Sequence, residues 1–222
     1  MTTQHAVLFD LDGTLVDSNE LHVAAWRDVF AQAGHDVSDE RIRGQIGKGG
    51  DKLVPALLPG VTKDEQEALS EAHGDVFTRH YRIRVRPFPG ARVLLARVAE
   101  TETKVVFASS ASKGDLDHYL GLLDARHLVA TATTIDDVTQ SKPAPDIFAT
   151  ALKKAGVAPD AAVALGDSPF DMIAARDAGI AAVAVRSGGF DDGALAEAGA
   201  IAIYDNVADL LAQFAGSPLD RA

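Results

Sequence analysis

Two aspartates stand two residues apart where a short apolar run ends. The run "AVLF" leads into "DLDGT", which contains Asp10 and Asp12 and turns at Gly13-Thr14. A carboxylate is ionised near neutral pH, so it needs no general base to attack phosphorus. Carboxylate oxygens are also the ligands that Mg²⁺ prefers. The pair is therefore compatible with phosphoryl chemistry, but on its own it fits a simple turn equally well, because aspartate and glycine are common turn residues.

Three more polar clusters follow apolar runs further along the chain. They are Ser109-Ser110 after "KVVFA", Lys142 in "QSKPAPD", and Asp167 in "ALGDSPFD" with Asp171 four residues on. Taken singly, each has a plain structural reading as a helix cap, a surface lysine or a first-turn acid. Ligands of open α/β sheets bind beyond the carboxyl ends of the strands. Four clusters at such positions together predict one site.

The elements that must position these residues are short buried strands alternating with helices. Residues 5–9 and 104–108 form the first two apolar runs, and four more follow in "LVATAT", "AAVALG", "IAAVAV" and "AIAIY". Runs that are apolar on both faces indicate strands covered by helices on both sides, and the alternation predicts a parallel sheet. The fold class is therefore α/β.

A helical block interrupts this pattern after the first strand. Residues 20–34 space their apolar side chains at helical intervals, and a second, more polar helix begins after Thr62. We therefore expect residues 1–15 and 87–222 to form the α/β domain and residues 16–86 to form an inserted helical cap. The expected hinges are Val16-Asp17 and Arg86-Pro87, where the nearby prolines fit a stiff connector.

Composition limits the possible partners. The chain has 222 residues, a formal net charge of −11 and no cysteine. Such a charge repels nucleic acid and anionic substrates alike, so an anion site must be built locally from a metal ion, lysines and backbone N–H groups. No apolar run approaches the roughly 20 residues that span a membrane, and we expect no secretory signal. These features predict a cytoplasmic protein and leave monomer and homodimer equally open.

The four clusters resemble, in order, the four motifs of the haloacid dehalogenase-like hydrolases. The motifs are "FDLDGTL", the strand-terminal serine, "SKPAPD" and "GDSPFD". The helical insertion after the first motif resembles the cap of the phosphoglycolate phosphatase and β-phosphoglucomutase branch. The resemblance implies a Rossmann-like core, a Mg²⁺ cofactor and a small phosphorylated metabolite as substrate.

The resemblance also implies roles for the core residues. Asp10 would be the nucleophile and Asp12 the proton carrier, and a like-charged neighbour would raise the pKa of Asp12. Mg²⁺ would be held by Asp10, the backbone carbonyl of Asp12 and Asp167, with Asp171 orienting a ligand or metal-bound water.

The phosphoryl group and the rest of the substrate would contact a second set of residues. Ser110, rather than Ser109, would bind a phosphoryl oxygen together with the backbone at Ala111, and Lys142 would pair with Asp10 and the phosphate. In the cap, His22 matches a hinge histidine of the mutase branch, and Lys48-Gly49 lie in a glycine-rich segment where the family has its specificity loop. A helix-face histidine and a flexible helix–helix turn are the plain alternatives for these cap residues.

The leading hypothesis is a Mg²⁺-dependent phosphatase that forms an aspartyl-phosphate. A phosphomutase of the β-phosphoglucomutase type is the alternative, although that branch usually has an arginine where this chain has Lys48. A dehalogenase has no use for a second acid at Asp12 and ranks lower. A non-catalytic binding protein on the same fold also remains possible, because fold alone does not give function.

Overall fold

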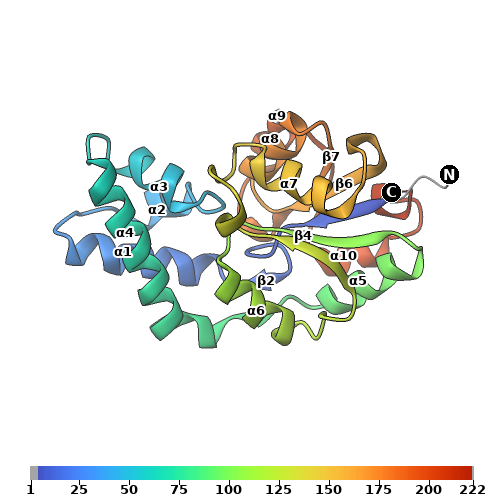
Figure 1. The fold of residues 1–222 in the computed structure, drawn as a ribbon, viewed down its shortest axis with the longest axis horizontal. Helices are drawn as coiled ribbons and strands as arrows, with labels where there is room; N and C mark the ends of the chain where they lie inside the picture. Colours follow the sequence, from blue (N-terminus) through green and yellow to red (C-terminus); the bar gives the residue numbers. More distant parts are fainter. Residues whose placement is uncertain (1–4, 222) are drawn as a thin grey trace.

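A six-stranded parallel sheet is the centre of the computed structural model, which describes residues 5–221 (Figure 1). The strand order is β5-β4-β1-β6-β7-β8, and every neighbouring pair is parallel. The strands are β1 (Ala6–Phe9), β4 (Lys104–Ala108), β5 (Val129–Thr133), β6 (Ala162–Gly166), β7 (Ala181–Val185) and β8 (Ala200–Tyr204). The predicted α/β class is confirmed, and each strand begins within one residue of the predicted position.

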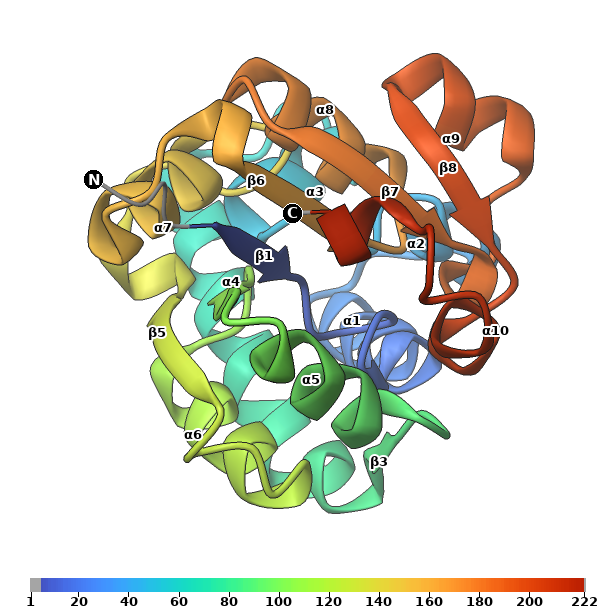
Figure 2. The ribbon, with the colours of Figure 1, turned by 90° about the vertical axis from the view of Figure 1, so that its right-hand side faces the viewer.

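Helices cover both faces of the sheet because successive strand side chains alternate between two cores. Val7 and Phe9 lie in one hydrophobic cluster, and Ala6 and Leu8 lie in the other. Figure 2 shows the two helical layers on opposite sides of the sheet. The first layer is α5 (Ala91–Glu100), α6 (Lys113–Leu122) and α10 (Val207–Ala212), and the second is α7 (Asp146–Ala155), α8 (Pro169–Asp177) and α9 (Asp192–Ala198).

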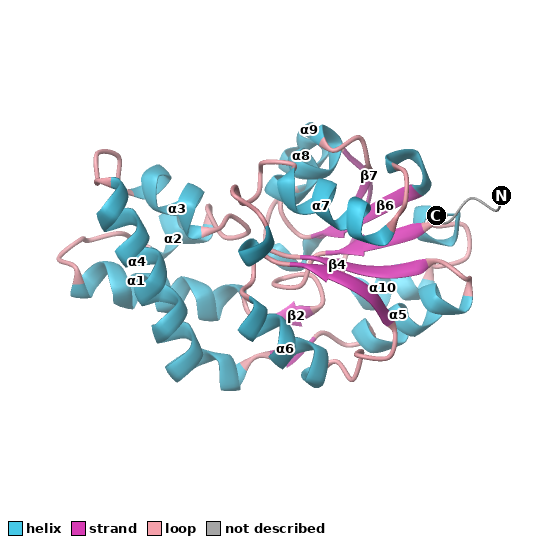
Figure 3. Ribbon diagram, in the orientation of Figure 1, coloured by secondary structure: helices cyan, strands magenta, loops and turns pink. Residues whose placement is uncertain are grey.

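Helices fill the segment between β2 (Val16–Asp17) and β3 (Arg86–Pro87), which we call the helical insertion (Figure 3). They are α1 (Asn19–Gln32), α2 (Asp39–Arg43), α3 (Gly50–Leu57) and α4 (Lys63–Val76), continued by a π-helical turn over Phe77–Tyr81 and a 3₁₀ turn over Arg82–Arg84. These helices pack around their own cluster, which includes Trp26, Phe30 and Leu53. The antiparallel pair β2–β3 lies at the two predicted hinges. The predicted domain boundaries stay a prediction.

Short 3₁₀ turns complete the described chain at Ile135–Asp137, Pro159–Ala161, Arg186–Gly188 and Pro218–Arg221. Within residues 5–221, none of the helices has the length and apolar character that crossing a membrane requires. The parallel strands direct all their carboxyl ends toward the helical insertion (Figure 1). This edge is therefore where the polar clusters of the sequence meet.

Candidate active site

The predicted core residues follow three adjacent strands and lie at one edge of the sheet. Asp10 follows β1, Ser109-Ser110 follow β4, and Asp167 follows β6. Since β1 pairs with both β4 and β6, the three strand ends are neighbours. Lys142 reaches the same place from the loop before α7.

A buried ion-pair network links the first, third and fourth motifs. The Lys142 Nζ atom lies 2.5 Å from Asp10 Oδ1 and 2.6 Å from Asp171 Oδ1. The three side chains are at most 9% exposed. The Thr14 hydroxyl lies 3.2 Å from Asp10 Oδ2 and 3.2 Å from Asp167 Oδ1, so it links the two carboxylates. The predicted pairing of Lys142 with Asp10 is present in this arrangement.

Burial sets the electrostatics of this network. It raises the pKa of Asp10 to about 7, with a further increase from Asp171, against the opposing effect of Lys142. Burial, together with the neighbouring carboxylates of Asp171 and Asp10, raises the pKa of Asp167 well above its usual range. Burial disfavours a charged Lys142, but Asp10 and Asp171 outweigh it and raise the pKa of that lysine. One lysine thus faces three carboxylates, which leaves an excess of negative charge.

The donor set fits a divalent cation. Carboxylate oxygens of Asp10, Asp167 and Asp171 lie within 4.8 Å of one another. Carboxylates so crowded and buried favour a hard cation that neutralises them. The backbone makes room for this cluster at Gly13, where φ is +76° and a Cβ atom would lie 2.1 Å from Asp167 Oδ2. A side chain at Gly188 would also contact Asp167, at 2.3 Å.

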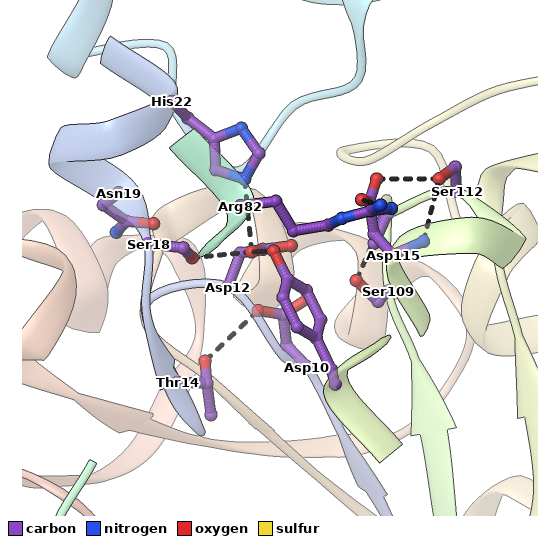
Figure 4. A network of polar contacts seen from close by, with 12 residues as sticks. Asp10, Asp12, Thr14, Ser18, Asn19, His22, Arg82, Ser109, Ser112 and Asp115 are labelled. Atoms are coloured by element: carbon purple, nitrogen blue, oxygen red, sulfur yellow. Dashed lines mark hydrogen bonds and ion pairs between the residues drawn. The ribbon is translucent and has the colours of Figure 1, made fainter. Parts of the chain in front are cut away.

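Asp12 lies beside this cluster in a different environment (Figure 4). Its Oδ1 atom accepts hydrogen bonds from Ser18 Oγ at 2.6 Å and Tyr119 Oη at 2.8 Å, and lies 3.2 Å from His22 Nε2. Burial alone would raise the pKa of Asp12, but His22 and the hydrogen bonds outweigh burial and lower it. The predicted raised pKa of Asp12 is therefore wrong for the free protein, because His22, Ser18 and the distant Tyr119 together stabilise the carboxylate.

The two serines after β4 differ in their partners. Ser109 is 1% exposed, and its Oγ accepts a hydrogen bond from the Ala111 N–H at 3.1 Å. Ser110 Oγ is buried and, in the described part of the chain, has no hydrogen-bond partner. Buried hydroxyls normally find a partner, so an unpaired one is a candidate for binding a ligand. This contrast favours Ser110 as the predicted phosphate-binding serine.

A cavity between the core and the helical insertion is lined by the remaining predicted site residues. Core residues Asp10, Asp12, Ser110 and Ala111 line it on one side. The opposite wall consists of residues of the insertion, including His22, Lys48, Gly49 and His73.

The insertion residues are held by specific contacts. Lys48 Nζ lies 2.5 Å from Gln45 Oε1 and 4.4 Å from the centre of the Phe170 ring, and partial burial lowers its pKa. The Gly49 N–H donates to Ser141 Oγ at 3.0 Å, next to Lys142. Because a Cβ atom at Gly49 would lie 2.6 Å from Ser141 Cβ, glycine permits the close approach of the insertion to the core here.

Sequence reasoning missed several groups that hold the predicted residues. His73 Nε2 lies 3.3 Å from His22 Nδ1, and Asn19 Nδ2 donates to Asp167 Oδ2 at 2.8 Å. Tyr119 and Ser18 contact Asp12, as described above. Thr14 stands within the first motif and was the one member that local sequence could have identified. His73 and Tyr119 lie on helices with no motif of their own, and Ser18 and Asn19 lie at the start of α1, a few residues beyond the first motif.

Comparisons with known proteins agree with this geometry. A protein-family model described as haloacid dehalogenase-like hydrolase matches residues 7–185. The phosphorylated carbohydrates phosphatase of Thermotoga maritima is 29% identical over 200 residues, which cover 89% of this chain and 93% of that protein. The phosphoglycolate phosphatase of Rhodospirillum rubrum is 29% identical over 214 residues, covering 92% and 88% respectively.

A solved structure shows the same architecture. The crystal structure of a hydrolase from Pseudomonas syringae superimposes with a TM-score of 0.89 at 33% sequence identity. The match covers 96% of this chain and 99% of that chain. It therefore spans both the sheet and the helical insertion.

Proposed function

The chain belongs to the haloacid dehalogenase-like hydrolase family, and from this premise we propose that it is a Mg²⁺-dependent phosphatase of small phosphorylated metabolites. The observation that carries the proposal is that Asp12, Ser110 and Lys142 lie around a cluster of three carboxylates, one of which is Asp10. Relatives named as phosphatases of phosphorylated carbohydrates and of phosphoglycolate support the reaction class.

Asp10 is the proposed nucleophile. One of its carboxylate oxygens forms a bond to phosphorus while the bond from phosphorus to the leaving oxygen breaks, which gives an aspartyl-phosphate and a free alcohol. Lys142 holds Asp10 in place and offsets part of the phosphate charge, and the Ser110 hydroxyl donates to a phosphoryl oxygen. Mg²⁺ would be held by Asp10, Asp167 and the carbonyl of Asp12, with Asp171 orienting a ligand or a metal-bound water. The ion would neutralise charge on the phosphoryl oxygens.

Asp12 is the proposed proton carrier. It gives a proton to the leaving oxygen in the first half-reaction and takes one from the attacking water in the second, when the aspartyl-phosphate is cleaved to inorganic phosphate. Because its pKa is lowered in the free protein, Asp12 must acquire its proton once an anionic substrate lies beside it. A nearby negative charge favours the protonated carboxyl, so substrate binding itself acts in that direction.

Hydrolysis of p-nitrophenyl phosphate and acetyl phosphate with Mg²⁺ and with a chelator tests the proposal. We expect turnover with Mg²⁺, strong loss with chelator, and an acid-stable phosphoryl group on the chain after rapid quenching. No turnover on these compounds and on a panel of sugar phosphates would favour a binding protein. Conversion of β-glucose 1-phosphate to glucose 6-phosphate without phosphate release, in the presence of the bisphosphate activator, would favour the mutase.

A further inference from the structure

A larger cleft extends from the catalytic cavity along α1 and α4. Its volume is about 690 Å³, within the range of roughly 300–1,000 Å³ typical of small-molecule sites. The cleft shares Ser110 and Ala111 of the core, and His22 and His73 of the insertion, with the catalytic cavity. A substrate whose phosphoryl group lies at Asp10 would therefore extend its leaving group into this cleft.

Negative charge dominates the wall of the cleft. Lys63 is the one lysine or arginine that lines the cleft within residues 5–221, and its 85% exposed side chain lies 3.6 Å from Glu67. Arg82, just outside the lining, lies 3.4 Å from Asp115 and offsets that acid. Lys52, also outside the lining, lies 4.0 Å from Asp51, which leaves Glu71 and Asp136 as the lining carboxylates without an ion-pair partner among the described residues. The acidic residues of the lining are Asp51, Glu67, Glu71, Asp115 and Asp136.

Among the residues that the structure describes, no lysine or arginine lines the inner end of the cleft, where His22 and His73 lie. Burial and the neighbouring His22 lower the pKa of His73 well below its usual value, so this imidazole stays neutral. Its ring stacks on Trp26 with centroids 4.1 Å apart, which makes the wall here aromatic. Lys48 lines the smaller catalytic cavity and not the cleft, and its ammonium group contacts Gln45 and the Phe170 ring.

We propose that this acidic, aromatic cleft is the leaving-group subsite, and that it selects phosphate monoesters of neutral or cationic polyhydroxylated alcohols. The inference rests on the proposed phosphatase function. Carboxylates accept hydrogen bonds from hydroxyl groups and pair with ammonium groups. The same carboxylates repel a leaving group with its own carboxylate or a second phosphate. Sugar, alditol and aminocyclitol monophosphates therefore fit, whereas phosphoglycolate and sugar bisphosphates do not.

Two matched substrate pairs test the charge preference without changing substrate length. Sorbitol 6-phosphate and 6-phosphogluconate differ at one terminal carbon, as do glycerol 3-phosphate and 3-phosphoglycerate. We expect kcat/KM to be at least about ten-fold higher for sorbitol 6-phosphate than for 6-phosphogluconate. The ratio should fall as salt is raised from 0.05 M to 0.5 M, because salt screens exposed charges. Equal values, or a preference for 6-phosphogluconate, would overturn the subsite.

A charge reversal in the cleft tests the assignment to these residues. Glu71 is an exposed lining residue of α4, and Glu71→Lys should lower the sorbitol 6-phosphate preference about five-fold by improving 6-phosphogluconate. Glu197→Lys is the matched control, since Glu197 is exposed on α9 and outside the cleft lining. An unchanged ratio in Glu71→Lys, or the same change in both variants, would contradict the proposal.

Acetyl phosphate separates this inference from the function on which it rests. Its leaving group is too small to enter the cleft, so wild type and the control Glu197→Lys should hydrolyse it equally with Mg²⁺. Absence of this hydrolysis in wild type would overturn the phosphatase itself. Hydrolysis of acetyl phosphate together with equal kcat/KM values for the matched pairs would overturn the subsite alone.

Discussion

The two walls of the active site differ in the burial of their side chains and in the lengths of their polar contacts. On the core wall, Asp10, Lys142 and Asp171 are joined by charged contacts of 2.5 and 2.6 Å, and their side chains are at most 9% exposed. On the insertion wall, His22 is 16% exposed and makes contacts of 3.2 and 3.3 Å to Asp12 and His73. The core wall is a closed electrostatic network, and the insertion wall is a set of longer, partly solvated contacts.

This difference suggests that the core wall carries out the reaction and that the insertion wall sets the substrate preference. Breaking a buried charge network by removing one partner is costly, because the remaining charges lose their compensation. Partly exposed contacts are weaker, so side chains in the insertion can change at lower cost to stability. We therefore expect substitutions on the core wall to abolish reaction and those on the insertion wall to change substrate preference.

The largest effect should follow from Asp10→Asn. Without the nucleophilic carboxylate, no aspartyl-phosphate forms, and kcat should fall on the order of 10⁴-fold or more. Rapid quench with a radiolabelled phosphate monoester measures both turnover and the phosphorylated chain. Asp177→Asn, at an exposed aspartate of α8, is the control for a general effect of the substitution. Phosphorylation that persists in Asp10→Asn would mean that another residue is the nucleophile.

Magnesium should stabilise the protein more at pH 8 than at pH 5.5. The folded-state pKa of Asp10 is raised to about 7, so the folded chain binds this proton more tightly than the unfolded chain does. In the absence of Mg²⁺, this group therefore lowers stability as pH rises from about 4 toward 7. Bound Mg²⁺ offsets that loss and, at 100 times its dissociation constant, adds about 2.7 kcal/mol.

Thermal unfolding with Mg²⁺ and with chelator, at both pH values, measures this coupling without any substrate. Asp167→Asn should greatly reduce the Mg²⁺-induced rise in Tm. An equal rise at pH 5.5 and pH 8 would show that protons and Mg²⁺ do not compete at this cluster.

The residues of the core wall are visible in the sequence for a physical reason. A strand buried on both faces must be apolar along its length, so a polar residue such as Asp10 or Asp167 at its end stands out. In a parallel sheet those ends lie at one edge, and β1 lies between β4 and β6. No local pattern gives the strand order. Because each motif follows a strand, however, the sequence alone led us to expect the four motifs at one edge of the sheet.

The environment of Asp12 could not be predicted in the same way. Tyr119, which donates to Asp12, lies 107 residues away on α6 and belongs to no motif. The neighbouring Asp10 suggested a raised pKa, and neither Ser18 nor His22, six and ten residues beyond Asp12, belongs to the first motif. Together with Tyr119 they reverse that direction. His73 was missed for a related reason, because its role depends on the packing of α4 against α1.

Tyr119→Phe should test how much the contacts added by the fold contribute to the environment of Asp12. The variant removes one hydrogen bond to Asp12 and retains the buried ring, so kcat should fall about ten-fold with little change in Tm. Loss of that donor raises the pKa of Asp12, so the limb of the kcat/KM profile that reports Asp12 should move to higher pH. An equal loss of rate at every pH would show that Tyr119 acts only through packing.

The smallest effect should follow from Lys48→Ala on the insertion wall. Lys48 contacts Gln45 and Phe170 rather than the carboxylate cluster, so its loss should leave Mg²⁺ affinity unchanged. We expect KM to change about three-fold, in different directions for different substrates, with kcat nearly constant, which indicates loss of uniform binding. Lys153→Ala, at an exposed lysine of α7, is the control. A fall in kcat as large as that of Tyr119→Phe would place Lys48 with the reacting groups, and the division between a chemical wall and a selecting wall would no longer hold.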